Sequence, residues 1–229
     1  MFEFVFLDLD DTLFDFGYSE AEALRTTLRQ FGIEPTETAI RRYSEINDAH
    51  WKRLERGELT RKEVQIGRFA CFLKEIGSSH DPQEVNRFYM NTIGDCFRYV
   101  DGAEKLLSDL RAMGCALYVV SNGTRAVQQK RLQKAGLSDF FDGVFLSEDI
   151  GAEKPNKSFF DACFQRVSNM KLESSIILGD SLTSDILGGI RAGITTCWFN
   201  PKNKQGRDDI VPDYEIKQLS KFPEIVCLG

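Results

Sequence analysis

The chain has 229 residues, 42% of them hydrophobic and 28% charged, and it carries a formal net charge of −6. These values are typical of a folded globular protein and exclude the disordered and fibrous classes. Proteins that bind the phosphate backbone of nucleic acids carry an excess of basic residues, and this chain is acidic overall. We therefore expect no nucleic acid polymer among its partners.

Five short apolar runs predict β-strands, and each is followed by a turn and a helical pattern. In chain order the runs are FEFVFLDLD, CALYVVSN, GVFLS, SSIILGD and TTCWFN. Strands that alternate with helices predict βαβ units and therefore a three-layer α/β fold, a parallel sheet covered by helices on both faces. A further edge strand is expected at residues 214–216.

The segment between the first two strands contains helix starts but no strand pattern. Capping-box patterns begin at Ser19 and Thr60, and Asp81 precedes a proline at a first helical position. Four helices are predicted here. We therefore expect an all-helical domain of residues 16–99, inserted into an α/β core domain of residues 1–15 and 100–229.

Three helices are predicted in the second half of the chain. The first begins at Thr124 and ends near Gly136, a typical C-terminal glycine. The second begins at Asn156 or Ser158, and the third is a short helix from Ser184 to about residue 193. They supply the helical layers of the predicted α/β core.

Cysteine spacing and hydropathy limit the cellular setting. No CxxC pair occurs among the six cysteines, which disfavours a zinc ribbon or a redox motif. The first apolar stretch has no basic segment before it, and no run approaches the ~20 apolar residues of a membrane-spanning helix. We expect a cytoplasmic protein with reduced thiols and no membrane partner.

Acidic residues follow the first predicted strand in the motif DLDDT. Residues two apart on a strand share a face, so Asp8 and Asp10 converge if the strand extends that far. Two close carboxylates repel each other unless a cation lies between them, which makes the pair a candidate metal or catalytic site. The structural alternative is an acid cluster that caps a turn or a helix.

Three further polar motifs follow predicted strands. Ser121 and Asn122 end a strand, Lys154 precedes a proline at a helix entrance, and Asp180 and Asp185 flank the start of a helix. Each has a structural alternative: a helix cap, a solvated loop lysine, or an acid in a first helical turn. Together with DLDDT they indicate one site, because ligands of open α/β sheets bind beyond the carboxyl ends of the strands.

The motifs DLDDTL, SNG, GAEKP and GDSLTSD together resemble those of haloacid-dehalogenase-superfamily (HAD) phosphohydrolases. The resemblance spans residues 8–185 and implies a Rossmann-like core with an inserted helical cap. It implies that Asp8 is the nucleophile, forming an aspartyl-phosphate, and that Asp10 is the general acid and base. It also implies a magnesium ion (Mg2+) held by Asp8, the Asp10 backbone carbonyl and Asp180, with Asp185 orienting the metal site.

The same resemblance gives roles to the remaining motif residues. Ser121, Asn122 and Lys154 are expected to bind the phosphoryl oxygens. Asp10 suits phosphatases and phosphomutases, since the dehalogenases lack this aspartate and the transport ATPases carry threonine there. Asp11 is expected to be structural, and Thr12 to pack or hydrogen-bond within the turn.

Three longer stretches resemble the branch of pyrimidine 5′-nucleotidases and related house-cleaning nucleotidases. They are FLDLDDTLFDF, LSEDIGAEKPNKSFFD and GDSLTSDILGGIRAGITTCWFNP. The implied substrate is a small-molecule phosphate ester, a nucleoside monophosphate such as UMP, dUMP or dTMP, including damaged or non-canonical pyrimidines. The open alternatives are a sugar phosphomutase, a sugar or glycolate-type phosphatase, and a catalytically idle binding module.

Aromatic and histidine residues near the cap raise further expectations. Phe14 or Phe16 is a hypothetical stacking partner for a base, whereas most cap aromatics fall on helical stripes and are expected in a core. His50 and His80 are expected at the surface. We expect a monomer or a small homo-oligomer.

Overall fold

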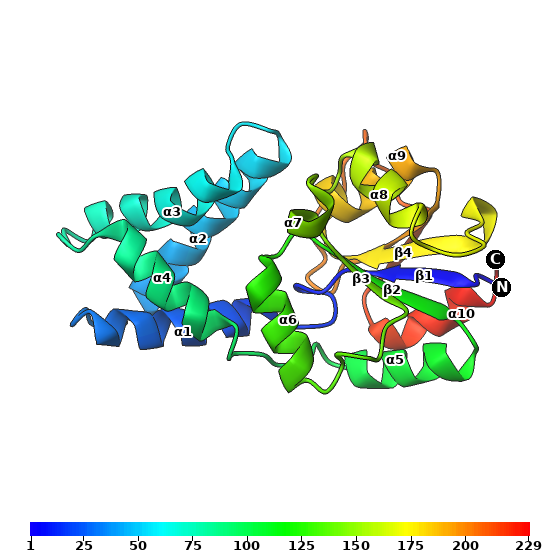
Figure 1. Cartoon of the computed structure of the whole chain (residues 1–229), viewed down its shortest axis with the longest axis horizontal. Coiled ribbons are helices and arrows are strands. Elements are labelled where there is room, and N and C mark those ends of the chain that lie inside the picture. Colours follow the sequence, from blue (N-terminus) through cyan, green and yellow to red (C-terminus); the bar gives the residue numbers. More distant parts are fainter. The chain divides into compact units, whose positions relative to one another are not determined.

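The computed structural model describes residues 1–229 and contains a six-stranded parallel sheet of order β3-β2-β1-β4-β5-β6 (Figure 1). The predicted α/β class and all six predicted strands are confirmed. The strands are β1 (Phe4–Leu7), β2 (Ala116–Ser121), β3 (Gly143–Leu146), β4 (Ser175–Gly179), β5 (Thr195–Phe199) and β6 (Tyr214–Ile216).

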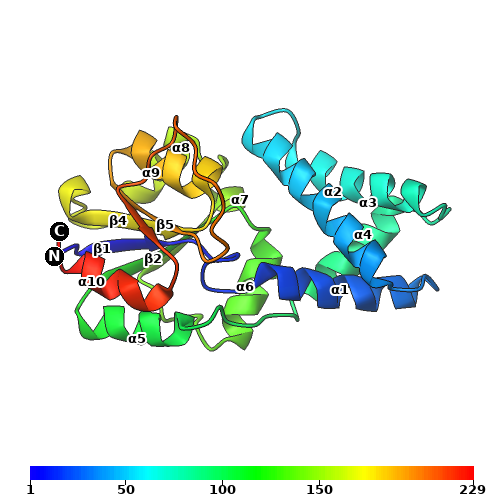
Figure 2. The same cartoon turned by 180° about the vertical axis from the view of Figure 1, so that it is seen from behind.

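Helices cover both faces of the sheet, as Figures 1 and 2 show. One face carries α5 (Ala103–Ala112) and α10 (Phe222–Val226), and the other carries α8 (Lys157–Phe164) and α9 (Leu187–Ala192). Gly188 of α9 permits close packing on α8, because a Cβ at this position would lie 2.5 Å from the Phe160 ring. Four shorter elements complete this layer structure: α7 (Ser147–Ile150), a π-helical turn (Leu182–Ile186) and two 3-10 turns (Leu172–Ser174 and Leu219–Lys221).

Strand β1 lies in the middle of the sheet, between β2 and β4. All four of its side chains are buried, as expected for a strand covered on both faces. The connections from β1 and from β3 lead to opposite sides of this strand, so its carboxyl end is a topological switch point, the usual place for a ligand in such sheets.

The chain divides into two compact units. The sheet unit comprises residues 1–15, 99–125 and 135–229, and the helical unit comprises residues 16–98 and 126–134. The sequence-based division assigned residues 126–134 to the core. In the structure they belong with the helical unit, because Val127 joins its apolar cluster and Lys130 forms an ion pair with Asp95.

The helical unit contains the four predicted helices of the insertion. They are α1 (Phe16–Gln30), α2 (Glu37–Glu55), α3 (Arg61–Glu75) and α4 (Pro82–Ile93), joined by most of α6 (Arg125–Lys134). Thr60 and Glu63 form the predicted capping box, and the Asp81 side chain caps α4 as predicted. None of the helices in the chain combines the length and the apolar character that a membrane-spanning segment requires.

Two expectations about the helical unit are wrong. Ser19 does not begin α1, which starts at Phe16; its buried hydroxyl accepts a hydrogen bond from Arg131 instead. His50 is not at the surface, because it is buried on α2 with Nδ1 2.7 Å from the Ile46 carbonyl. The expected aromatic core is confirmed for Tyr43, Phe69 and Phe72, which are fully buried together with Tyr89.

Candidate active site

Asp8 is the first residue after β1, and its N–H donates to the Leu178 carbonyl at 3.0 Å, which extends the pairing with β4. The chain then turns sharply, since the Leu9 carbonyl accepts the N–H groups of Leu13 and Phe14. Asp11 takes a left-handed conformation in this turn, with a φ of 59°, which aspartate tolerates better than bulkier residues. The turn places the Asp8 side chain at the carboxyl end of the central strand.

Lys154 is a buried cation at the centre of the candidate site. Its Nζ donates to Asp8 Oδ1 at 2.7 Å, to Asp185 Oδ1 at 2.6 Å and to the Val120 carbonyl at 2.8 Å. All three ammonium hydrogens therefore have acceptors. Only 2% of the side chain is exposed, which excludes the alternative of a solvated loop lysine.

The backbone of Lys154 is held by the side chain of Asn122. Asn122 Nδ2 donates to the Lys154 carbonyl at 2.9 Å, and the Lys154 N–H donates to Asn122 Oδ1 at 2.8 Å. Ser121 is buried beside it at the end of β2, and its Oγ accepts the Gly123 N–H at 3.0 Å. Asn122 thus positions the lysine, a role that the sequence reasoning missed.

Both oxygens of Asp8 receive a donor. Lys154 contacts Oδ1, and the Thr12 hydroxyl donates to Oδ2 at 3.3 Å, in agreement with the hydrogen-bonding role expected for Thr12. The carboxylate is therefore fixed in rotation. Phe14, in contrast, is fully buried and its ring packs against Tyr99 at 5.4 Å between centroids. This packing gives no support to the hypothesis that Phe14 stacks on a base.

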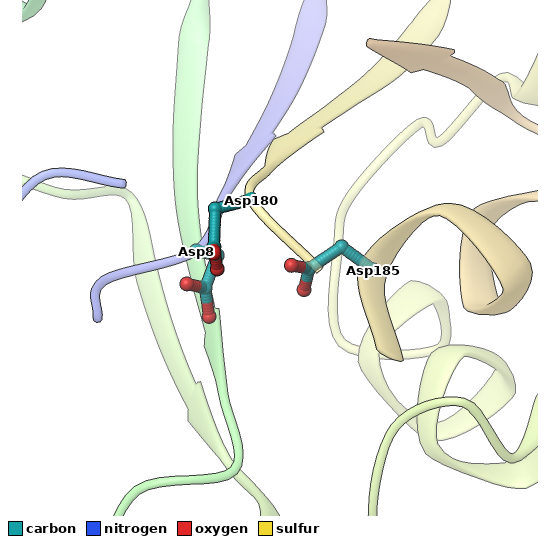
Figure 3. Close-up of side chains that lie close together, drawn as sticks. All are labelled: Asp8, Asp180 and Asp185. Atoms are coloured by element: carbon teal, nitrogen blue, oxygen red, sulfur yellow. The ribbon is translucent and has the colours of Figure 1, made fainter. Parts of the chain in front are cut away.

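Three carboxylates converge beyond the ends of β1 and β4, as Figure 3 shows for Asp8, Asp180 and Asp185. One oxygen of each lies within 4.8 Å of the others. Asp185 Oδ2 accepts the Ser181 N–H at 3.1 Å, and a Cβ at Gly179 would lie 2.3 Å from this carboxylate. The glycine that ends β4 is therefore required for Asp185 to approach.

Asp180 is held by two residues that the sequence reasoning did not select. The Trp198 indole Nε1 donates to the Asp180 carbonyl at 2.9 Å, and Lys204 Nζ donates to Asp180 Oδ2 at 3.0 Å. The pairing of β4 with β5 sets Gly179 beside Trp198. If the pairing of β4 with β5 had been predicted from sequence, it would have put Trp198 beside Asp180. No sequence pattern predicts that Lys204 lies there.

Burial dominates the electrostatics of the acids. It raises the pKa of Asp8 well above its usual range, against the opposing pull of Lys154 and with added repulsion from Asp185 and Asp10. Burial likewise raises the pKa of Asp180 to about 6, although Lys204 opposes the shift. Burial alone would lower the pKa of Lys154, but Asp185 and Asp8 raise it above its ordinary value, so this lysine stays protonated.

The donor set fits a hard divalent cation. Carboxylate oxygens are the ligands that Mg2+ prefers, and both Asp8 and Asp180 are acids for which burial makes ionisation unfavourable. A cation between them would offset this cost. Asp185 already uses its two oxygens on Lys154 and the Ser181 N–H, so it is suited to orienting the site.

Comparison with known proteins identifies the family. Residues 5–199 match the family model of haloacid dehalogenase-like hydrolases. The chain belongs to this family. The HAD-hydrolase YfnB of Bacillus subtilis is 40% identical over 96% of this chain and 93% of its own length. Its crystal structure, bound to magnesium, matches with a TM-score of 0.94 over 98% of both chains.

Two further relatives lie in the branch that the longer sequence stretches resemble. The pyrimidine 5′-nucleotidase YjjG of Escherichia coli is 30% identical over 98% of this chain and 98% of its own. The pyrimidine 5′-nucleotidase PynA of Streptococcus pneumoniae is 33% identical over 94% of this chain and 91% of its own. The family and the branch expected from the motifs are both confirmed.

Proposed function

We propose that this HAD hydrolase is a Mg2+-dependent phosphomonoesterase that releases phosphate from pyrimidine nucleoside 5′-monophosphates. The observation that carries the proposal is the buried Lys154, which links Asp8 to Asp185 next to the Asp180 carboxylate. This arrangement holds the carboxyl group of the proposed nucleophile beside a fixed cation, in a chain similar to two pyrimidine 5′-nucleotidases.

Asp8 is the proposed nucleophile. Its carboxylate attacks phosphorus in line and forms an aspartyl-phosphate, while Asp10 gives a proton to the leaving alkoxide. Water then attacks this acyl phosphate, Asp10 takes its proton, and phosphate leaves with Asp8 restored. Lys154 and Thr12 fix the rotation of Asp8, which aligns the attacking oxygen before substrate arrives.

The remaining residues bind phosphate and metal. Ser121 is the proposed hydroxyl donor to a phosphoryl oxygen, and Lys154, whose three hydrogens already have acceptors, supplies the fixed positive charge beside the phosphoryl group. Because the Asn122 amide is engaged with the Lys154 backbone, we assign the phosphate contact of this residue to its backbone N–H. Mg2+, held by Asp8, Asp180 and the Asp10 backbone carbonyl, would reduce the repulsion between the nucleophile and the phosphate.

The helical unit is the proposed cap. An inserted domain of this kind selects the leaving group and excludes water when it closes over the substrate. Its buried aromatic cluster gives it a core of its own. We assign the choice between a pyrimidine nucleoside and other leaving groups to this unit.

A substrate panel tests the proposal. Phosphate release is measured from UMP, dUMP, dTMP, purine nucleotides, hexose phosphates and phosphoglycolate, with Mg2+ or with EDTA, for the wild type and Asp8→Asn. We expect pyrimidine nucleotides to give the highest kcat/KM, and EDTA or the substitution to abolish release. Faster hexose phosphate interconversion than hydrolysis, or activity that survives Asp8→Asn, would contradict it.

A further inference from the structure

The loop after β5 is built to place one lysine. Asn200, which follows β5 and is buried, donates from Nδ2 to the Lys204 carbonyl at 3.0 Å and accepts the Lys204 N–H on Oδ1 at 2.8 Å. The same Nδ2 donates to Glu215 Oε1 at 2.8 Å, on β6. The backbone of Lys204 is therefore fixed to the sheet, although the loop itself is exposed.

The side chain of Lys204 ends on the proposed metal ligand Asp180. Its Nζ lies 3.0 Å from Asp180 Oδ2, while 49% of the lysine side chain and 17% of the aspartate side chain are exposed. The ammonium thus supplies a positive charge to an acid that is mostly removed from water. It also occupies Oδ2, one of the two Asp180 oxygens that are able to bind a metal ion.

Other groups around Asp180 do not supply such a charge. Asp185 and Asp11 are acids that disfavour its ionisation, and Trp198 donates only to its backbone carbonyl. Lys154 is committed to Asp8, Asp185 and a carbonyl. Lys204 is therefore the lysine that pairs with the Asp180 carboxylate.

We propose that Lys204 is a tethered counter-ion of the metal site, which competes with Mg2+ for the Asp180 carboxylate and leaves it when the metal binds. The inference rests on the proposed function, which makes Asp180 a metal ligand. Since the lysine stem is half exposed, it can turn into solvent while Asn200 keeps the backbone in place. The competition lowers the affinity of the site for Mg2+ and limits the electrostatic cost of the metal-free state.

Calorimetric titration of EDTA-treated protein with MgCl2 tests this role. Replacing Lys204 by Met or by Gln removes the competing charge, so we expect about two- to fivefold tighter Mg2+ binding, the size expected for an exposed ion pair. Lys204→Arg keeps the charge and should bind close to the wild-type affinity. Lys202→Met is the matched control, because it removes an exposed lysine from the same loop.

Thermal unfolding supplies a second readout. A purely structural role of Lys204 would lower the melting temperature equally with and without Mg2+, whereas a counter-ion role makes the Mg2+-induced increase larger in the Met and Gln variants. Asp180→Asn separates the two proposals. If the wild type binds Mg2+, Asp180→Asn does not, and both neutral variants match the wild type, then only the role of Lys204 is overturned. If the wild type binds no Mg2+, both proposals fail.

Discussion

Lys154 and Lys204 reach the same acidic cluster through the same backbone device, but only one of them is buried. In each case an asparagine side chain binds both the N–H and the carbonyl of the lysine, Asn122 in the first and Asn200 in the second. The exposed fraction of the side chain is 2% for Lys154 and 49% for Lys204. The difference in burial separates two kinds of charge. Lys154 is a permanent part of the site with three acceptors, whereas Lys204 can be replaced by a metal ion.

The largest contrast is expected when each lysine is replaced by methionine. Lys154→Met leaves Asp8 and Asp185 buried without their cation, so we expect a loss of about 3–5 kcal/mol in the free energy of unfolding. Lys204→Met should lose less than about 1 kcal/mol, because its pair is partly exposed. Urea unfolding in EDTA measures both. Equal losses would show that burial does not distinguish the two lysines.

The pH dependence of stability in EDTA tests how far the ionised Asp180 carboxylate destabilises the fold. Its pKa in the fold, about 6, lies above the ordinary value of 3.8, so the folded state binds more protons between these pH values. Stability is therefore fully present below about pH 4 and is lost as the pH rises through about 6. Asp180→Asn cannot ionise, so it should be more stable than the wild type at pH 7.5, by on the order of 2 kcal/mol.

The control for this prediction is the same pair of proteins at pH 4.5, with EDTA present throughout. There the wild-type carboxyl is largely protonated, and the difference in unfolding free energy between wild type and Asp180→Asn should shrink. A difference that is the same at both pH values would mean that ionisation of Asp180 does not lower the free energy of unfolding.

The indole of Trp198 offers a smaller test at Asp180, the acid that pairs with the exposed Lys204. Trp198→Phe keeps an aromatic ring in a buried position but removes the hydrogen bond to the Asp180 carbonyl. We expect a loss of about 1 kcal/mol in stability and a several-fold weaker affinity for Mg2+, because Asp180 is less well oriented. Cys197→Ala is the comparison, because it alters the neighbouring buried position on β5 without touching that hydrogen bond. It should affect stability alone, and an equal loss of Mg2+ affinity in both variants would show that the indole has no orienting role.

The smallest effects are expected from the two asparagines. Asn122→Ala should lower kcat by about two- to threefold while Mg2+ affinity stays close to the wild type, because Lys154 loses its alignment but keeps its buried acceptors. Asn200→Ala should tighten Mg2+ binding less than Lys204→Met, because the lysine is freed rather than removed. Steady-state kinetics measures kcat, and calorimetry measures the affinity for Mg2+. If Asn200→Ala lowered kcat as much as Asn122→Ala does, the two asparagines would not have the different roles assigned to them here.

Local patterns in the sequence predicted the frame of this molecule. Alternation of apolar runs with helical stripes predicted all six strands and the four inserted helices, because burial on two faces or on one stripe leaves a periodic record. The strand-end motifs predicted that Asp8, Lys154 and Asp180 belong together, and the structure brings them into one cluster with Asp185. The roles given to these residues in catalysis stay predictions.

Contacts between distant loops could not be predicted in the same way. Asn122 and Lys154 are 32 positions apart, and Lys204 is 24 positions from Asp180. Such pairs depend on strand order and loop path, which no short-range pattern records. The same holds for residues 126–134, which join the helical unit through Val127 although they follow β2 in sequence.

Trapping of the phosphoryl group on Asp8 tests the central claim most directly. Asp10→Asn is mixed with p-nitrophenyl phosphate and Mg2+, quenched in acid, digested and analysed by mass spectrometry. This leaving group needs no proton from Asp10, so the intermediate should form and its hydrolysis should be slow. We predict one added phosphoryl group on the peptide that contains Asp8, and none in the Asp8→Asn, Asp10→Asn double variant. A phosphoryl group on another residue, or none despite turnover by the wild type, would contradict the account.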